Sequence, residues 1–367
     1  MLLPHRAALT YLFSNLQLAA IETVLNTAPV INYTAFYPSR PFWTISRLDL
    51  RDPSVVSDLT DRMSEIVLTF DQQQYTLKIC RDGMFMLRIH ELELQVPQGD
   101  RLTSAQLAAL WADYLDCLNT LQLLFESSVL EIMKHAYFEL GEITTRDAFR
   151  VSFDDQHKWT GNSVPMFSPA ASLLMARYTS SYSPALPPFA DARFLMRIEV
   201  PETVFVDLNT HFTTVLAAGS AVQRLATLAK SLAEFKIGNY PTSLVLSWFV
   251  IESSLLGSWR NLLDAKSSPA AGTAQHIGKK RREALTGRDF PIAVVLNVLE
   301  LSDVLAFDEW KDLDEIRGFR NKVVHQDPRF KCEATHAIRS LQAARRLLEQ
   351  QIKFSLRPNL GYTVTGM

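Results

Sequence analysis

The hydrophobic pattern changes near residue 200, and this change constrains the fold more than any other feature of the chain. Between residues 31 and 96, short segments of β-branched and aromatic residues alternate with polar breaks such as Asp71-Gln72-Gln73 and Arg81-Asp82-Gly83. Such a pattern is typical of strands joined by tight turns. After Val200-Pro201-Glu202, apolar residues recur at helical spacing almost to the end of the chain. We therefore expect an α+β part followed by an all-α part.

The first part is expected to hold a small antiparallel sheet and a long helix. The predicted strands are residues 42–50, 65–70, 75–80, 84–96, 145–153 and 193–200. Helical spacing predicts an amphipathic helix over residues 9–25 and a long core helix that ends near residue 140, with Leu102-Thr103-Ser104 as its candidate cap. The stretch 163–188, rich in Ser, Pro and Tyr, is the expected mobile loop.

The second part is expected to be a helical bundle. The predicted helices are residues 204–235, 241–263, 292–301, 307–325 and 332–352. With 367 residues the chain is long enough for two hydrophobic cores, and Gly238-Asn239-Tyr240-Pro241 forms a joint between them. We place the boundary near residue 236. This gives an α+β regulatory or sensor domain (1–235), a helical domain (236–356) and a C-terminal tail (357–367).

Composition argues against several classes of protein. The chain is 47% hydrophobic and 21% charged, as soluble globular proteins are. Its most apolar windows fall short of the roughly 20 residues that cross a bilayer, and the N-terminus lacks a secretory pattern, so we expect a cytoplasmic protein without membrane contact. The cysteines Cys80, Cys117 and Cys332 are scattered, and the histidines lack metal-binding spacing. We expect no disulfide framework, no metal and no cofactor.

Positive charge is concentrated toward the C-terminus. From His276 onward there are 16 Lys and Arg against 12 Asp and Glu, whereas the preceding residues hold the remaining 21 and 27, respectively. The net charges of +4 and −6 add to the −2 of the whole chain. A polyanionic substrate is compatible with this distribution but is not required by it.

The predicted helix over residues 307–325 presents a polar cluster near its C-terminal end. Asn321 and His325 are four residues apart, which places them about 40 degrees from each other around a helix. Arg320 flanks Asn321, and Arg317 precedes Asn321 by four residues on the same stripe. A guanidinium, a carboxamide and an imidazole group are thus expected together, just before Asp327-Pro328 breaks the helix.

This arrangement resembles the RxxxxH motif of HEPN domains. The spacing from Arg320 to His325, a last helix after a short turn, and an upstream helix with Trp248, Glu252 and Trp259 are similar to that family over residues 236–356. The resemblance implies a metal-independent endoribonuclease that leaves cyclic-phosphate products and acts as a toxin or in anti-phage defence. It also implies a homodimer, in which two motifs face each other across a composite site.

The residue types suit RNA cleavage without a metal ion. The imidazole of His325 can exchange protons near neutral pH, as removal of a proton from a ribose 2′-OH requires. Arg320 can pair bidentately with phosphate oxygens, and Asn321 can orient either the histidine or the phosphate. A structural interpretation also stays open for each group. His325 suits the helix dipole, Arg317 and Arg320 can pair with Asp312 or Asp314, and Glu252 can hold a motif arginine or form a buried structural pair.

A basic run, Lys279, Lys280, Arg281 and Arg282, offers a second candidate contact with RNA phosphates. The alternative for this run is a solvated loop or the start of a helix. For the whole protein, the alternative to a nuclease is a non-catalytic HEPN-like module for RNA binding, protein binding or dimerisation. A third hypothesis is a toxin that a partner silences, such as a nucleotidyltransferase antitoxin. In the leading nuclease hypothesis, the N-terminal part would sense a trigger, restrain the nuclease or recruit RNA.

Overall fold

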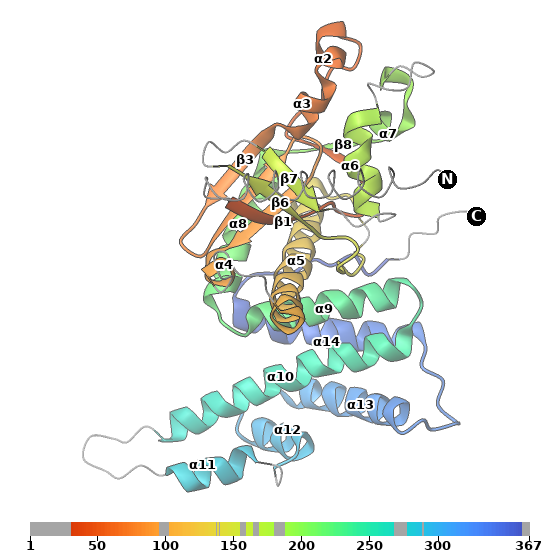
Figure 1. Ribbon diagram of the computed structural model, residues 1–367. Coiled ribbons are helices and arrows are strands. Elements are labelled where there is room, and N and C mark those ends of the chain that lie inside the picture. Colours follow the sequence, from red (N-terminus) through yellow and green to blue (C-terminus); the bar gives the residue numbers. More distant parts are fainter. Residues whose placement is uncertain are drawn as a thin grey trace, which may run out of the picture.

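The fold is known from a computed structural model. It describes residues 31–94, 103–136, 138, 140–154, 159–163, 169–179, 188–267, 277–287 and 290–361. The predicted helix over residues 9–25 and the last part of the predicted tail lie outside the described residues. An antiparallel sheet with several helices occupies the N-terminal part, and helices alone make up the rest (Figure 1).

The sheet has six strands in the order β3-β4-β5-β1-β6-β7, and every neighbouring pair is antiparallel. The strands are β1 (Ile31–Phe36), β3 (Ile66–Asp71), β4 (Tyr75–Cys80), β5 (Phe85–Ile89), β6 (Phe149–Phe153) and β7 (Trp159–Ser163). The turn from β4 to β5 requires Gly83, which has φ +87° and lies so close to Phe42 that a Cβ atom would come within 2.7 Å of its ring. The predicted antiparallel sheet is confirmed.

Both faces of the sheet are covered at β4, which is buried along its whole length. Because successive side chains of a strand point to opposite faces, Leu77 and Ile79 pack on the side of α5 (Ser104–Met133). Cys80 belongs to the core of the other face, which α6 (Pro169–Thr179) covers with Ala170 and Leu174. The sheet is therefore the middle layer of three.

Residues 42–50 do not form one strand of this sheet, and that prediction was wrong. Only β2 (Phe42–Thr44) is extended, and it pairs in parallel with β8 (Ile198–Val200) in a separate two-stranded sheet. The strand ends at Ile45, whose φ of +68° turns the backbone away. A loop then leads to α2 (Pro53–Ser57) and α3 (Leu59–Ser64).

Three other predictions in the N-terminal part were wrong, two of them because short apolar runs do not distinguish strands from helices. The strand predicted over residues 84–96 ends at Ile89 and continues as α4 (His90–Leu94). The strand predicted over residues 193–200 begins within α7 (Ala192–Leu195). The predicted loop over residues 163–188 contains α6, and the short helix η1 (Pro188–Ala190) begins at its end.

The long helix α5 begins at a capping box, as the sequence predicts. The hydroxyl of Thr103 accepts a hydrogen bond from the Gln106 N–H at 3.3 Å, and the Gln106 side chain accepts one from the Thr103 N–H at 2.9 Å. Near its other end, Phe125 lies between the sheet and α8, with ring centroids 5.1 Å from Phe85 and 5.8 Å from Phe205. The helix ends at Met133, before the predicted residue 140.

Helices make up the chain from residue 202 onward. They are α8 (Glu202–Ala217), α9 (Ala221–Lys236), α10 (Tyr240–Ser267), α11 (Lys279–Thr286), α12 (Ile292–Leu301), α13 (Phe307–Val324) and α14 (Ala334–Ile352). The single helix predicted over residues 204–235 is two helices, because the turn between them needs Gly219 at φ +59°. The other predicted helices have their counterparts here.

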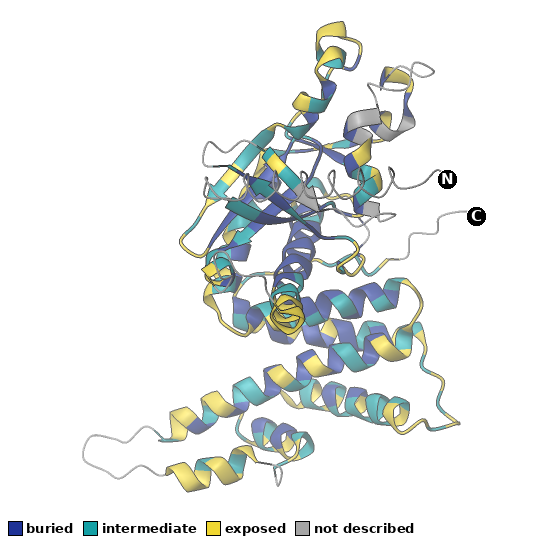
Figure 2. Cartoon of the chain, in the orientation of Figure 1, coloured by how far each residue is buried: buried dark blue, intermediate teal, exposed yellow. Residues whose placement is uncertain are grey.

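One hydrophobic core runs from the sheet into the bundle. Leu121 of α5, Leu232 of α9 and Trp248 of α10 belong to the same buried cluster. Figure 2 shows buried residues on the facing sides of α9, α10 and α14. The predicted boundary near residue 236 falls in the turn between α9 and α10, and the core continues across it. None of the described helices is both long enough and apolar enough for a membrane span.

Candidate active site at the end of helix α13

The polar cluster lies on the last turn of α13. Leu313 and Ile316 are buried and fix one side of the helix against the bundle. Arg320 and Asn321 are partly exposed, and His325 follows as the exposed C-cap residue. The helix therefore brings the predicted catalytic residues to one end of the bundle, where solvent reaches them.

A Schellman motif holds His325 in place. The N–H of Gln326 donates to the Val323 carbonyl at 3.1 Å, and the N–H of Asp327 donates to the Lys322 carbonyl at 2.9 Å. Gln326 adopts a left-handed conformation with φ +52°. The helix therefore ends because of the conformation at Gln326, two residues before the Pro328 that the sequence suggested as the breaker.

Arg320 differs from the other arginines of α13 and α14. Arg317, Arg339, Arg345 and Arg346 each make an ion pair with a carboxylate. Among the described residues, Arg320 makes none. Its Nη1 donates to the Asn321 side-chain oxygen at 3.1 Å, and its buried Nε has no hydrogen-bond partner. The guanidinium is held in position and can still accept an anion.

The carboxylates nearby are already engaged by other arginines. Arg317 pairs with Asp314 at 2.7 Å, one of the structural alternatives considered for this residue. Asp312 pairs with Arg346 at 2.8 Å and with Arg339 of the same helix. Arg317 is thus a surface ion-pair residue in this state of the molecule, and Asp312 and Asp314 leave Arg320 unpaired.

Glu252 bonds to a residue of its own helix. Its carboxylate accepts a hydrogen bond at 3.0 Å from the indole N–H of Trp248, one turn earlier on α10. Within the described part of the chain, Glu252 makes no ion pair with Arg317 or Arg320. Trp259 is also engaged elsewhere, since its indole N–H donates to the Leu285 carbonyl of α11 at 2.9 Å.

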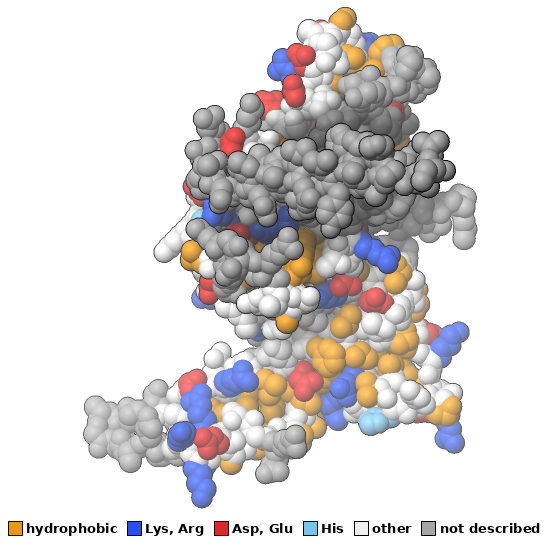
Figure 3. All heavy atoms as spheres, in the orientation of Figure 1, with side chains coloured by type: hydrophobic (Ala, Val, Ile, Leu, Met, Phe, Trp, Pro, Cys, Tyr) orange, Lys and Arg blue, Asp and Glu red, His pale blue; other side chains and the backbone are white. Residues whose placement is uncertain are grey.

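The basic run forms the first turn of α11, at the opposite end of the bundle from the C-terminal end of α13 (Figure 1). Lys and Arg side chains gather at this end of the molecule (Figure 3). Lys279, Lys280 and Arg281 are exposed, and Arg282 pairs with Asp264 near the end of α10. On α14, Ser340 bonds instead to Ser247 in the first half of α10, with 2.6 Å between the two hydroxyl oxygens. Ser247 and Asp264 are 17 residues apart on α10, so at a rise of about 1.5 Å per residue these two contacts lie roughly 25 Å apart along the helix. We therefore expect the basic run and His325 of one chain to contact different phosphates.

Sequence reasoning missed an aromatic group beside the motif. Phe319 and Phe330 are parallel, with centroids 5.9 Å apart and an interplanar angle of 7°, and His336 packs on both rings. The ammonium of Lys322 lies 5.3 Å from the Phe330 ring centroid. A helix wheel cannot predict this group, because Phe330 comes from the turn after the helix. The sequence signal that could have indicated this group is the alternation of Phe319, Lys322 and Phe330 around the motif.

Comparisons with known proteins add no assignment. No family model, no curated protein and no solved structure matches this chain. Across the described residues, no three His, Cys, Asp or Glu side chains converge in a way that would hold a metal ion. A function therefore has to be inferred from the chemistry of the residues at the end of α13.

Proposed function

We propose that the α10–α14 bundle is a metal-independent endoribonuclease of the HEPN type that acts in the cytoplasm as a toxin or in anti-phage defence. One observation carries the proposal. Arg320 lies beside Asn321 and about one turn from an exposed histidine. Among the described residues, it lacks the carboxylate partner that every other arginine of α13 and α14 has. A structural arginine would be expected to use the nearby acidic residues.

The proposed reaction is attack of a ribose 2′-OH on the adjacent phosphorus. His325 removes the hydroxyl proton, the 2′ oxygen bonds to phosphorus, and the 5′ oxygen leaves with a proton. Arg320 stabilises the negative charge of the phosphorane, and its hydrogen bond to Asn321 keeps the guanidinium oriented. The products are a 2′,3′-cyclic phosphate and a free 5′-OH.

Base and acid are both required, and one copy of the motif offers a single histidine at the end of α13. A homodimer that brings two such ends together supplies the second group. Lys322 lies within the motif and Phe330 follows it, and they can hold a phosphate by charge and a neighbouring base by stacking, respectively. The basic run on α11 would contact RNA phosphates farther from the cleaved bond.

The experiment is RNA cleavage by the purified full-length chain in EDTA. We expect His325→Ala to reduce the rate by at least about a hundredfold and Arg320→Ala to reduce it comparably. Arg329→Ala removes an exposed arginine just beyond the same turn and should leave the rate unchanged. If the wild-type protein binds RNA without cleaving it, the non-catalytic HEPN-like module is the better description.

Dimerisation and partners can be tested separately. If the site is composite, the specific activity should rise with protein concentration in step with the dimer fraction measured by sedimentation. A silencing antitoxin predicts that expression of the chain alone is toxic and that toxicity disappears in the His325→Ala variant. The N-terminal part then has the role of sensing a trigger, restraining the nuclease or recruiting RNA.

A further inference from the structure

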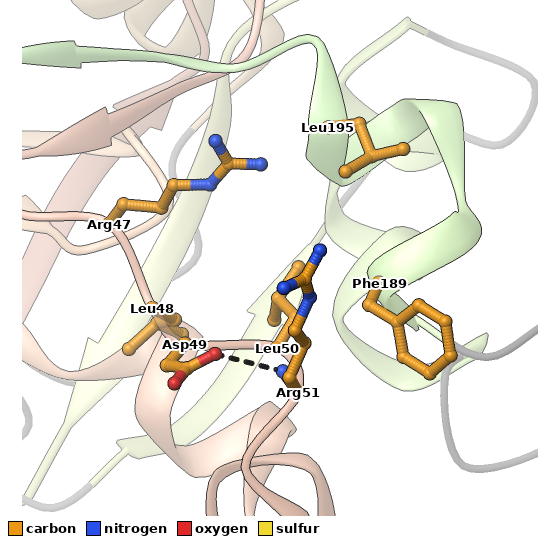
Figure 4. A pocket seen from close by; sticks show the side chains of 7 residues that line it. All are labelled: Arg47, Leu48, Asp49, Leu50, Arg51, Phe189 and Leu195. Atoms are coloured by element: carbon orange, nitrogen blue, oxygen red, sulfur yellow. Dashed lines mark hydrogen bonds between the residues drawn. The ribbon is translucent and has the colours of Figure 1, made fainter.

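A cleft of about 470 Å³ lies in the N-terminal part, far from α13 in the fold (Figure 1, Figure 4). One wall is the loop that follows β2, and the other is formed by η1 and α7. Its volume falls in the range of small-molecule sites, about 300–1,000 Å³. The ribonuclease proposed above uses none of its residues.

Two arginines extend from the loop toward α7 (Figure 4). Arg47 and Arg51 are both exposed, and within the described part of the chain neither makes an ion pair. The one carboxylate in the lining, that of Asp49, accepts a hydrogen bond from the Arg51 backbone N–H at 3.0 Å. The acidic group is thus engaged by the loop itself, and both guanidinium groups remain available to an anion.

The loop is held in an unfavourable conformation by bonds to its surroundings. Ile45 has φ +68°, a conformation that β-branched residues rarely adopt. Its N–H donates to the Val200 carbonyl at 2.9 Å, and the next residue, Ser46, accepts a hydrogen bond from Arg81 at 3.0 Å. Backbone strain of this kind persists where the surrounding structure enforces it, often at ligand sites. The start of the loop that carries both arginines is therefore fixed in position.

The opposite wall is apolar. The side chains of Phe189 and Leu195 are 49% and 44% exposed, respectively, and both line the cleft. Exposure of two large apolar side chains opposite two cations matches a ligand that is anionic at one end and flat and apolar at the other. Arginine pairs with phosphate through two parallel hydrogen bonds, and an aromatic side chain can stack on a nucleobase.

We propose that this cleft binds a nucleotide, with Arg47 and Arg51 on the phosphates and Phe189 on the base. The inference is independent of the ribonuclease activity, because it concerns binding at a separate site of the same chain. Inorganic phosphate alone would engage the arginines only, and should therefore bind more weakly than a nucleotide.

Titration calorimetry of the full-length protein with ATP, AMP and inorganic phosphate tests the proposal. We expect ATP to bind, AMP to bind more weakly, and phosphate to bind most weakly. The double variant Arg47→Ala/Arg51→Ala should weaken ATP binding by about tenfold or more for each guanidinium lost. Phe189→Ala should weaken ATP binding and leave phosphate binding unchanged. Arg62→Ala, an exposed arginine of α3 outside the cleft, is the matched control.

Three results would overturn the proposal. The first is absence of ATP binding at millimolar concentration. The second is ATP binding of equal strength in the double variant, provided that its thermal unfolding matches that of the wild type. The third is phosphate affinity equal to that of ATP, because the apolar wall would then contribute nothing to recognition.

Discussion

At the scale of single residues, Glu126 is a carboxyl group that α5 carries into the core. Its side chain is 3% exposed. Burial raises the pKa of Glu126 from 4.5 to about 8, although the Lys236 ammonium and a backbone hydrogen bond from Asn359 oppose the shift. The group is therefore mostly protonated at neutral pH in the folded protein and ionised in the unfolded chain.

Stability should consequently fall as the pH rises from about 4.5 to about 8. In that window the folded state binds a proton that the unfolded state has lost, and the slope is at most about 1.4 kcal/mol per pH unit. Between pH 6 and pH 8, the free energy of unfolding should therefore fall further in the wild type than in the Glu126→Gln variant, by roughly 2 kcal/mol. Urea unfolding at both pH values measures this. Asp113→Asn, an exposed carboxyl on the same helix, is the control, and parallel pH profiles for wild type and Glu126→Gln would refute the prediction.

Helical spacing predicted the polar cluster at the end of α13. It did not predict which of the charged side chains there form ion pairs. The positions of Arg317, Arg320 and His325 follow from the helix period alone. The pairing of Asp312 with Arg339 and Arg346 depends on where α14 packs, and no local pattern encodes that position. Among the described residues, the lack of an ion pair at Arg320 thus depends on tertiary packing, which the sequence alone could not indicate.

At the scale of elements, α13 ends at a left-handed backbone conformation that is unfavourable for the residue adopting it. Gln326 occupies the left-handed position of the Schellman motif at φ +52°, where glycine is usual. A side chain at this position places Cβ close to the backbone, which costs free energy that glycine avoids. The turn that carries His325 is therefore formed at some expense of stability.

Replacement of Gln326 by glycine should stabilise the protein by about 0.5–1 kcal/mol, because relief of the left-handed strain exceeds the entropy that glycine adds to the unfolded chain. Gln326→Ala keeps a Cβ and should give no gain. Thermal or urea unfolding of the three proteins measures the difference. A Gln326→Gly variant less stable than the alanine variant would contradict this account.

Elements were predictable where local pattern and tertiary environment agree. Residues 75–80 and 292–301 form a strand and a helix with the predicted bounds, since the first is flanked by turns and the second begins after Pro291. The prediction of a strand over residues 42–50 failed for two reasons. Strand β2 stops at Ile45, whose backbone is strained, and β2 pairs with a strand more than 150 positions away in the sequence. A partner at that separation leaves no local signal.

At the scale of the whole molecule, the two parts share α9. Leu225, Leu228 and Leu232 are buried in the core that α5 and α10 also line. Buried polar contacts cross the same interface, since the hydroxyl of Ser231 donates to the Ser243 carbonyl of α10 at 2.7 Å. Helix α9 therefore packs against elements of both parts.

This shared core predicts that the sheet and the bundle unfold together. Hydrogen exchange measured by mass spectrometry along a urea series should give the same midpoint for peptides of β4 and of α14. Leu232→Ala removes a buried side chain of α9 and should cost about 2–5 kcal/mol. Because both parts bury that side chain, we expect the two midpoints to shift by the same amount. A shift confined to the bundle would instead establish the boundary near residue 236 as the border between independently folding domains.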